Sequence, residues 1–414
     1  MDARQWFCII IFVITYIGMA RGSFPGLILD RVAIAWLGAV ALLTAGVIHF
    51  QQATQFINFE TLGLLLGMMV IVAVLRRARF FVRVADWAAS RVATQHGFLF
   101  LVIVLSSTFS AILVNDVICL ALPPLVIRVC RDRGWSVKPH LIALALASNL
   151  GSACTPIGNP QNMLIAEWSH ISFLTFLSRL SVPTLISLLG CFGIMCLMFQ
   201  KSLSSTIPIE RTLHDVIYLK PSRRHDRLMV KSILILVITV AGFLAGFHLA
   251  TVALTAAAVL ILDRFSPRFI WREIDWSLLL MFTGLFIVVG AMDAIIIQPG
   301  NWTQWPLLER DPVGLLSLLS ATLSNLVSNV PAVLLFKPIL LSLPVAQQET
   351  GWLALAMSST FAGNLTILGS VANLIVVEYA RRDGINISFW DYSKVGIPVT
   401  IGSILIGVFW LWMS

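Results

Sequence analysis

The feature that most limits the possible folds is an internal duplication. The stretch at 106–162 matches the stretch at 320–373 when one is shifted by 211 to 214 positions. The aligned pairs are Thr108 and Thr322, Ser110 and Ser324, Asn115 and Asn329, Pro124 and Pro338, Thr155 and Thr366, Gly158 and Gly369, Asn162 and Asn373, and Glu167 and Glu378. Gly67 likewise matches Gly284 at an offset of 217. The chain is therefore expected to fold as two units of one design.

The composition places both units in a membrane. The chain of 414 residues is 58% hydrophobic and only 12% charged, and soluble proteins carry roughly twice that charged fraction. Its apolar residues form runs of about 15 to 24 residues, which is typical of membrane helices. The first run, 6–20, is followed by Arg21 and by no small-residue cleavage site. We therefore expect a membrane span there and not a signal peptide.

Each half is predicted to contain five spans and one hairpin that enters and leaves the membrane on the same side. The expected spans are 6–20, 32–49, 57–75, 141–168, 180–199, 228–247, 251–262, 276–291, 352–379 and 395–413. Residues 80–95 have the spacing of an amphipathic helix in the membrane interface. The stretches at about 97–130 and 314–343 are too short for two full spans each, so re-entrant helical hairpins are expected, with tips at Asn115 and Asn329.

Because five spans is an odd number, the second half must enter the membrane from the opposite side. The fold class is thus predicted to be an all-α polytopic membrane protein built as an inverted repeat, with broken helices at mid-membrane. The first repeat covers 1–205, a cytoplasmic linker 206–227, and the second repeat 228–414.

The distribution of basic residues predicts the orientation. If both termini lie outside the inner (plasma) membrane, most of the 28 Lys and Arg residues fall on the cytoplasmic side. The four exceptions are Arg4, Arg179, Arg310 and Lys337. Membrane topology therefore accounts for the net charge of +8, and no nucleic-acid partner is expected.

Four interruptions of apolar segments, two in each half, predict a binding site. Two prolines and a glycine within 155–160 cannot sit in a continuous helix. Backbone groups freed at bilayer depth are costly unless they line a cavity or bind a solute. Helix N-termini there offer amides to an anion or polar solute, and freed carbonyls offer oxygens to a cation. The expected substrate-binding residues are Asn115, Thr155, Gly158, Asn159, Asn162, Ser328, Asn329, Thr366, Gly369 and Asn373. The alternative is that the interruptions are kinks that serve packing alone.

Asp116 is the only carboxylate at the four interruptions. Its repeat partner is Val330, so the duplication does not require an acid there. An ionisable group at this depth is expensive and usually functional. We expect Asp116 to carry a coupling proton or to ligate a cation; the alternative is a tip exposed to cytoplasmic water.

Other ionisable residues give weaker signals. Lys337 can attract an anion or, more commonly, extend its ammonium group to the membrane interface. Glu167 and Glu378 are a repeat pair at helix ends, where solvation is the simplest role. The histidines at segment ends are expected to cluster with nothing: His49, His140 and His248. No metal site is predicted.

The six cysteines lie in or at the ends of apolar segments, with no spacing typical of a zinc site or a disulfide framework. Their simplest role is small apolar filler. Cys119 and Cys154 flank the predicted site, however, and a thiol pair there is able to hold trivalent arsenic.

These motifs resemble the ion-transporter superfamily, which includes arsenite-efflux permeases, citrate and dicarboxylate transporters, and certain sodium/proton antiporters. The resemblance covers nearly the whole chain and rests on the tip Asn115-Asp116, the break Thr155-Pro-Ile-Gly-Asn-Pro-Gln-Asn162 and the tip Ser328-Asn329. The Asn-Asp tip is similar to the arsenite-permease branch, whereas dicarboxylate transporters usually show Ser-Asn-Thr at both tips.

The resemblance implies a homodimer and an elevator-like motion. The first three segments of each half would stay fixed, and the hairpins and broken helices would slide with the substrate. The implied activity is secondary active transport of a small inorganic anion or oxyacid, with arsenite/antimonite efflux coupled to protons as the first choice.

Three other functions remain as alternatives: two have the same fold, and the third requires only a membrane protein. A sodium- or proton-coupled carboxylate (citrate/dicarboxylate) transporter and a sodium/proton antiporter have the same fold. A membrane enzyme or channel is the third, although no nucleophile–base pair is visible. No cofactor is expected beyond a coupling ion, H⁺ or Na⁺. The sequence contains no phosphate-binding loop, so energy from ATP would require a partner subunit.

Overall fold

The computed structural model describes residues 2–21, 29–204, 223–262, 267–297 and 310–414, and these residues form helices and no strand. Most of the predicted linker at 206–227 lies outside the described residues. A helix begins at Arg223, within its last five positions, and the linker itself stays a prediction. The first half contains α1 (Ala3–Arg21), α2 (Arg31–Thr44), α3 (Phe50–Phe56), α4 (Phe59–Arg77), α5 (Phe80–Arg91), α6 (Gln95–Ile112), α7 (Asn115–Ala121), α8 (Pro123–Asp132), α9 (Val137–Ser152), α10 (Pro160–Ser169), α11 (Phe173–Met198) and α12 (Gln200–Ser204).

The second half repeats this order of elements. It contains α13 (Arg223–Leu244), α14 (Leu249–Ile261), α15 (Pro267–Glu273), α16 (Trp276–Met292), the π-helix η1 (Asp293–Ile297), α18 (Gly314–Val327), α19 (Asn329–Ser342), α20 (Val345–Ala362), the 3₁₀ turn η2 (Ile367–Gly369), α21 (Val371–Arg382) and α22 (Phe389–Met413). Both predicted hairpins and both broken helices correspond to helix pairs in this order. The inversion of one half relative to the other stays a prediction.

The lengths of the helices differ from the expected spans in two ways. Among the described residues, seven helices are long and apolar enough to cross a membrane: α1, α4, α6, α11, α13, α16 and α22. We expected α6 to be a short arm of a hairpin, but its 18 residues extend for about 27 Å. The predicted span at 32–49 instead ends as a helix at Thr44, because the chain turns at Gly46 with a φ of +66°.

The two halves cross each other twice at matching glycines. A Cβ atom on Gly67 of α4 would lie 2.7 Å from the backbone of Ala253 in α14, and one on Gly284 of α16 would lie 2.8 Å from the backbone of Ala35 in α2. Only glycine permits helices to approach so closely. The repeated glycine therefore permits two close helix contacts between the halves, one with the glycine on α4 of the first half and one with it on α16 of the second half.

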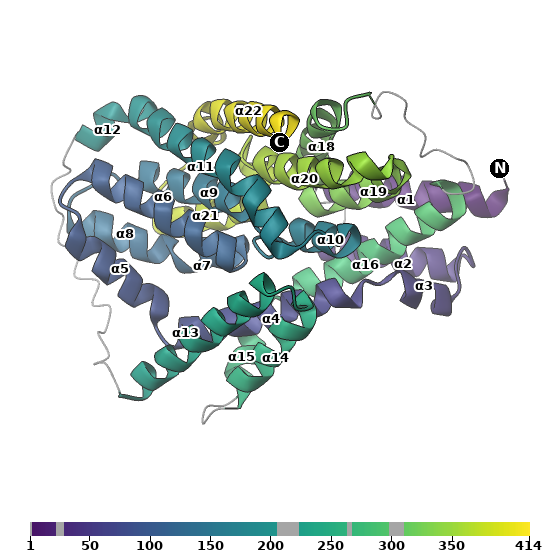
Figure 1. Cartoon of the computed structure of the whole chain (residues 1–414), viewed down its shortest axis with the longest axis horizontal. Helices are drawn as coiled ribbons and strands as arrows, with labels where there is room; N and C mark the ends of the chain where they lie inside the picture. Colours follow the sequence, from purple (N-terminus) through teal and green to yellow (C-terminus); the bar gives the residue numbers. More distant parts are fainter. Residues whose placement is uncertain (1, 22–28, 205–222, 263–266, 298–309) are drawn as a thin grey trace.

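The helices form two groups that are visible in Figure 1. The frame group consists of α1–α4 and α13–α16, in which α4 packs on α14 and α2 packs on α16. The core group consists of α6–α11 and α18–α22, in which α9 is almost completely buried and α20 is buried from Gly351 to Ala362. The two groups meet where α10 contacts α4 and where α18 contacts α1.

Ion pairs join helix ends that the sequence places on the same side of the membrane. Lys138 at the start of α9 lies 2.9 Å from Asp391 at the start of α22, and Arg76 at the end of α4 lies 2.6 Å from Glu273 at the end of α15. At the opposite ends, Arg179 of α11 lies 3.8 Å from Glu349 of α20. These contacts agree with the predicted grouping of helix ends and leave open which side is cytoplasmic.

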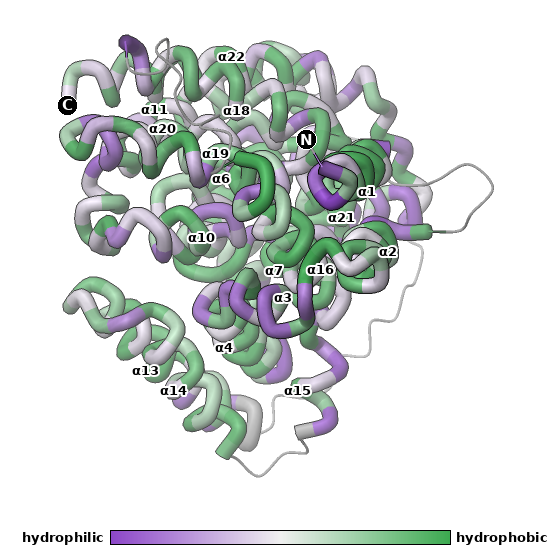
Figure 2. The backbone as a smooth tube through the Cα atoms, turned by 90° about the vertical axis from the view of Figure 1, so that its right-hand side faces the viewer, coloured by the Kyte–Doolittle hydropathy of each residue, from purple (hydrophilic) through white to green (hydrophobic). Residues whose placement is uncertain are grey.

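The outer helices present apolar side chains outward, as a lipid-facing surface requires. Figure 2 shows long hydrophobic stretches along α13, α14 and α22. Leu189 of α11, Ile238 of α13 and Leu405 of α22 are each about 60% exposed (63%, 60% and 63%). Buried polar residues such as Ser148 and Asn149 of α9 and Ser358 and Ser359 of α20 lie inside the core group.

Candidate functional site

The break in the first half is held by side chains from the break itself. Helix α9 ends at Ser152 and α10 begins at Pro160, with Asn159 as its N-cap. The side-chain nitrogen of Asn162 donates hydrogen bonds to the carbonyls of Ser152 (3.1 Å) and Thr155 (3.0 Å). Two of the carbonyls freed by the interruption therefore have a partner inside the protein.

The second break is held in the same way. Asn373, the repeat partner of Asn162, donates from its side-chain nitrogen to the carbonyls of Gly363 (2.7 Å) and Thr366 (3.1 Å). Each of these three positions lies 211 residues after its counterpart. The asparagine pair thus has a shared structural role that explains its presence in both halves.

The glycine of each break lies against neighbouring backbone. A Cβ atom on Gly158 would fall 2.2 Å from the carbonyl oxygen of Ser152, and one on Gly369 would fall 2.9 Å from the carbonyl oxygen of Gly363. The chain folds back on the end of the preceding helix at both places. A side chain at either position would push the two segments apart.

Asn149 of α9 connects the two halves at the centre of the core group. Its side-chain nitrogen donates to the side-chain oxygens of Asn364 and Asn373, both at 2.9 Å. Its side-chain oxygen accepts from the side chains of Asn115 and Ser370, both at 3.1 Å. All four hydrogen bonds are buried, so the first tip, the first broken helix and the second broken helix are joined through one residue.

The first tip is anchored to the first break. The backbone N–H of Asn115 donates to the carbonyl of Gly158 at 2.9 Å, and the Thr155 hydroxyl donates to the carbonyl of Ala111 at 2.5 Å. The second tip has a different device: Ser328 has φ +78° and ψ +160°, a conformation that costs free energy in residues other than glycine. Strain of this kind concentrates at functional sites.

The two tips meet at one small pocket. It is lined by Asn115 and Asp116 from the first tip, by Ser328 and Asn329 from the second, and by Arg31 from α2 of the frame group. The cavity measures about 50 Å³, counted as the space open to the centre of a water molecule. The pocket therefore lies at the contact between the core group and the frame group.

The first turns of α10, α19 and α21 also line this pocket. Pro160 and Gln161 of α10, Asn329 and Val330 of α19, and Val371 of α21 line it. Helix N-termini carry partial positive charge and free N–H donors. The pocket therefore favours solutes with electron-rich oxygens, and the guanidinium of Arg31 adds to this preference.

The tips also contribute two acceptors without a partner. The side-chain oxygens of Asn115 and Asn329 are buried and form no hydrogen bond within the described residues. The two residues are only 5% and 9% exposed. Buried acceptors without a partner are costly, so both oxygens keep an unused capacity to accept a hydrogen bond beside the pocket.

The predicted site residues separate into two sets. Asn115, Asp116, Ser328 and Asn329 line the pocket between the tips. The other seven do not line it and instead hold the breaks in shape through hydrogen bonds or close backbone contacts: Thr155, Gly158, Asn159, Asn162, Thr366, Gly369 and Asn373.

Sequence reasoning missed four residues of the site. Arg31 and Ser370 line the pocket, Gln161 lines it and also donates to Thr360 at 3.2 Å, and Asn149 joins the network. Gln161 lies inside the break motif at 155–162, and Asn149 lies six residues before its first position. The sequence indicates for Arg31 only a place at the end of an apolar segment, because no local pattern shows which segment ends reach the pocket between the tips.

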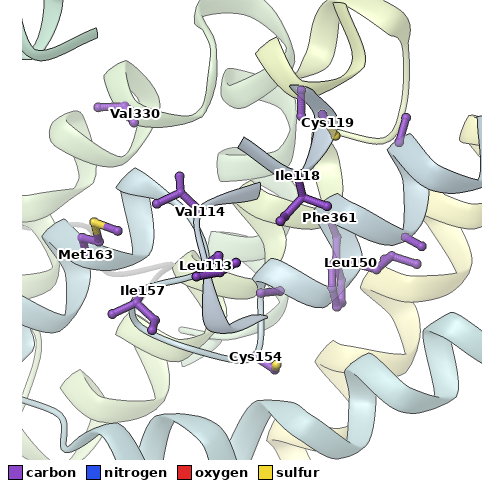
Figure 3. Packing of buried hydrophobic residues seen from close by; sticks show 14 of the residues in the cluster. Leu113, Val114, Ile118, Cys119, Leu150, Cys154, Ile157, Met163, Val330 and Phe361 are labelled. Atoms are coloured by element: carbon purple, nitrogen blue, oxygen red, sulfur yellow. The ribbon is translucent and has the colours of Figure 1, made fainter. Parts of the chain in front are cut away.

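Apolar side chains enclose the first tip and the first break. Figure 3 shows Leu113, Val114 and Ile157 packed around them, with Cys154 near the break and Cys119 on the far side of the tip. Neither cysteine lines the pocket between the tips. All six thiols are free, and five of them are buried.

The other ionisable residues lie outside this pocket. The ammonium group of Lys337 lies 4.7 Å from the ring centre of Trp168. Glu378 pairs with Arg381 and Arg382 at 3.0 and 3.1 Å. The expectation for His248 was wrong: it lies 2.9 Å from Glu60 and forms a group with Glu167, because the fold brings together three helix ends that are distant in sequence.

Together, the apolar outer helices, the interrupted helices and the pocket between the tips are typical of a polytopic membrane transporter. The citrate transporter family model (CitMHS) matches residues 9–362, and the chain belongs to this family.

Three relatives that are named as transporters align with this chain over nearly the whole length of both proteins. An uncharacterized transporter of Mycobacterium tuberculosis is 32% identical, with 93% of this chain and 94% of that protein covered. The silicon efflux transporter LSI3 of Oryza sativa subsp. japonica is 29% identical, with 93% of each covered. A Dictyostelium discoideum protein named as a transporter, arsB, is 26% identical, with 98% and 92% covered.

Two solved transporters share the fold. The YdaH transporter of Alcanivorax borkumensis aligns with a TM-score of 0.58 at 16% identity, over 99% of this chain and 97% of that one. MtrF of Neisseria gonorrhoeae aligns with a TM-score of 0.60 at 11% identity, over 99% and 94%.

Proposed function

We propose that this chain is a secondary transporter that exports a small oxyacid, with arsenous acid (arsenite) and its antimony analogue as the first choices, in exchange for protons at Asp116. One observation carries the proposal: the first turns of three helices line the pocket between the tips, together with two asparagines whose carboxamide oxygens have no partner among the described residues.

The pocket matches the chemistry of an oxyacid. The hydroxyl groups of a protonated oxyacid donate hydrogen bonds, and the side-chain oxygens of Asn115 and Asn329 can accept them. The oxygens of the same molecule accept hydrogen bonds, and the helix N-termini and Arg31 can donate them. A solute that carries both functions on a few atoms satisfies both sides of the pocket.

The size of the pocket supports a small solute. A cavity of about 50 Å³ has room for roughly four water molecules, and thus for a solute of roughly four or five non-hydrogen atoms. Arsenous and silicic acids are of this size. Citrate has about three times as many non-hydrogen atoms and would require the tips to separate.

Asp116 supplies the coupling in this proposal. It lies in the first turn of α7 and lines the pocket with Arg31. Among the described residues, neither side chain forms an ion pair within 4 Å, so both charges are available to the pocket. Entry of a proton at Asp116 would remove the negative charge beside the solute, and loss of the proton on the other side would restore it.

The relatives support the same class of solute. One relative is named as a silicon efflux transporter and another carries the name arsB. Silicic and arsenous acids are both small and neutral in water near pH 7. The proposed setting is the inner (plasma) membrane with both termini outside, a homodimer, and an elevator-like motion of the core group against the frame group.

A carboxylate transporter coupled to sodium or protons is the second candidate. Arg31 and the helix N-termini favour it, and so does the description of the family as citrate transporters. Carboxamide oxygens and Asp116 would also suit a sodium ion.

The test is arsenite accumulation in everted membrane vesicles, with a pH gradient applied and then collapsed. We expect accumulation that requires the gradient and is lost in Asp116→Asn, with the variant present at wild-type amounts. Silicic acid, citrate and succinate are run in parallel, with and without sodium. Sodium-dependent citrate uptake without arsenite accumulation would overturn the proposal in favour of the second candidate.

A further inference from the structure

Three ionisable side chains from three separate helices meet where the frame group contacts the core group. Glu60 lies in the first turn of α4, His248 is the N-cap of α14, and Glu167 lies near the end of α10. One ligand atom from each lies within 4.8 Å of the others. None of the three lines the pocket between the tips.

The two glutamates lie against each other, and either a shared proton or a bound cation relieves the repulsion between their carboxyl groups. The carboxyl groups of Glu60 and Glu167 are within hydrogen-bonding distance of each other, although two carboxylates repel at this range. The positive or titratable groups that face them are the imidazoles of His248 and His170. A bound cation would relieve the repulsion and join the three side chains.

The His248 ring places its two nitrogens against different partners. Its Nδ1 atom lies 3.1 Å from the Thr251 hydroxyl, and its Nε2 atom lies 2.9 Å from a carboxylate oxygen of Glu60. Nδ1 also accepts from the backbone N–H of Thr251 at 3.5 Å, so Nε2 would have to lose its proton to bind a metal. Metal-binding histidines usually hydrogen-bond through the ring nitrogen that does not bind the metal. Nε2 therefore faces the other two ligands.

We infer that Glu60, Glu167 and His248 form a binding site for a divalent transition metal, with Zn²⁺ as the best match. One imidazole and two carboxylates leave a fourth position for water, as zinc commonly has. Ligand atoms around tetrahedral zinc lie about 3.3 Å apart, from bonds of about 2.0 Å. The side chains of Glu60 and His248 are half exposed (50% and 49%), so they are free to rotate. Rotation can bring the three ligand atoms, which lie within 4.8 Å of one another, to the spacing that zinc requires.

A metal at this site would connect the two groups of helices. Glu60 and His248 belong to the frame group, and Glu167 belongs to the core group. The repeat partner of Glu167, Glu378, is paired with arginines instead, so the second half has no copy of this arrangement. If the core group moves during transport, which rests on the proposed function, the metal would hold it in one position and slow transport.

Metal binding is tested on the purified full chain in detergent, without an affinity tag and after treatment with a chelator. Calorimetric titration with Zn²⁺ should show one saturable site per chain, and Co²⁺ should give the visible absorption of a tetrahedral N/O site. Glu167→Gln and His248→Ala should each weaken Zn²⁺ binding at least tenfold. The matched control Glu378→Gln should bind as the wild type does.

Two results would overturn the inference: no saturable Zn²⁺ binding to the wild type, or wild-type affinity in both Glu167→Gln and His248→Ala. Glu60→Gln provides a third variant if either of these fails to fold, as judged by its melting temperature without metal. Inhibition of transport by Zn²⁺ is measured separately in vesicles, so a failure of the proposed transport activity would leave the binding result intact.

Discussion

Asn149 donates a 2.9 Å hydrogen bond from its side-chain nitrogen to the side-chain oxygen of Asn373, which lies 224 positions further along the chain. The first residue belongs to the helix before one break and the second to the helix after the other. The same side chain of Asn149 also accepts from Asn115 at the first tip. The parts that line the pocket are therefore fastened to one another within the core group.

Loss of this connection should destabilise the fold. In Asn149→Ala, the buried side chains of Asn115, Asn364 and Asn373 each lose the hydrogen bond that they form with Asn149. We expect the free energy of unfolding to fall by about 2–4 kcal/mol. Thermal unfolding of the purified protein in detergent measures the change. Gln51→Ala on the exposed surface of α3 is the control and should change stability by less than about 0.5 kcal/mol. Equal melting temperatures for the two variants would contradict this role.

The glycine crossings make a second prediction about stability. Gly67→Ala and Gly284→Ala each place a methyl group within 2.8 Å of backbone atoms of the facing helix, and each should cost about 1–3 kcal/mol through overpacking. Gly193 in α11 has nothing within 4 Å of a Cβ atom. Gly193→Ala should therefore be neutral or slightly stabilising. If all three variants melted at the same temperature, the close crossings would not exist as described.

Ser328 offers a variant that should gain stability. Its φ of +78° and ψ of +160° belong to a region that glycine adopts readily. Ser328→Gly should stabilise the protein by about 1 kcal/mol, and Ser328→Val should destabilise it by at least that amount. Thermal unfolding of both variants beside the wild type tests this. A lower melting temperature for Ser328→Gly would indicate that the serine hydroxyl contributes more than the strain costs.

Much of the architecture could be predicted because it follows from periodicity and from helix breakers. The break at 153–159, for example, follows from prolines and a glycine that no continuous helix accommodates. The tips at Asn115 and Asn329 begin helices as expected, since polar residues there interrupt apolar runs.

The roles within the site were harder to predict. Sequence shows that Asn162 and Asn373 match, but it does not show whether their amides face a solute or the backbone; here they face backbone carbonyls. Arg31 and His248 were missed for a related reason. Their contacts depend on the packing of helices distant in sequence, and no local pattern records that packing.

The central claim is that the carboxamide oxygens at the two tips bind the solute. Its most direct test is equilibrium binding of arsenous acid to the purified protein, with bound arsenic quantified by mass spectrometry. Asn329→Leu removes an acceptor that has no partner among the described residues and keeps a similar volume. Thr322→Ser, on the exposed side of α18, is the control. We predict one saturable site per chain in the wild type and the control, and affinity about tenfold weaker in Asn329→Leu. Unchanged affinity in Asn329→Leu would contradict the account.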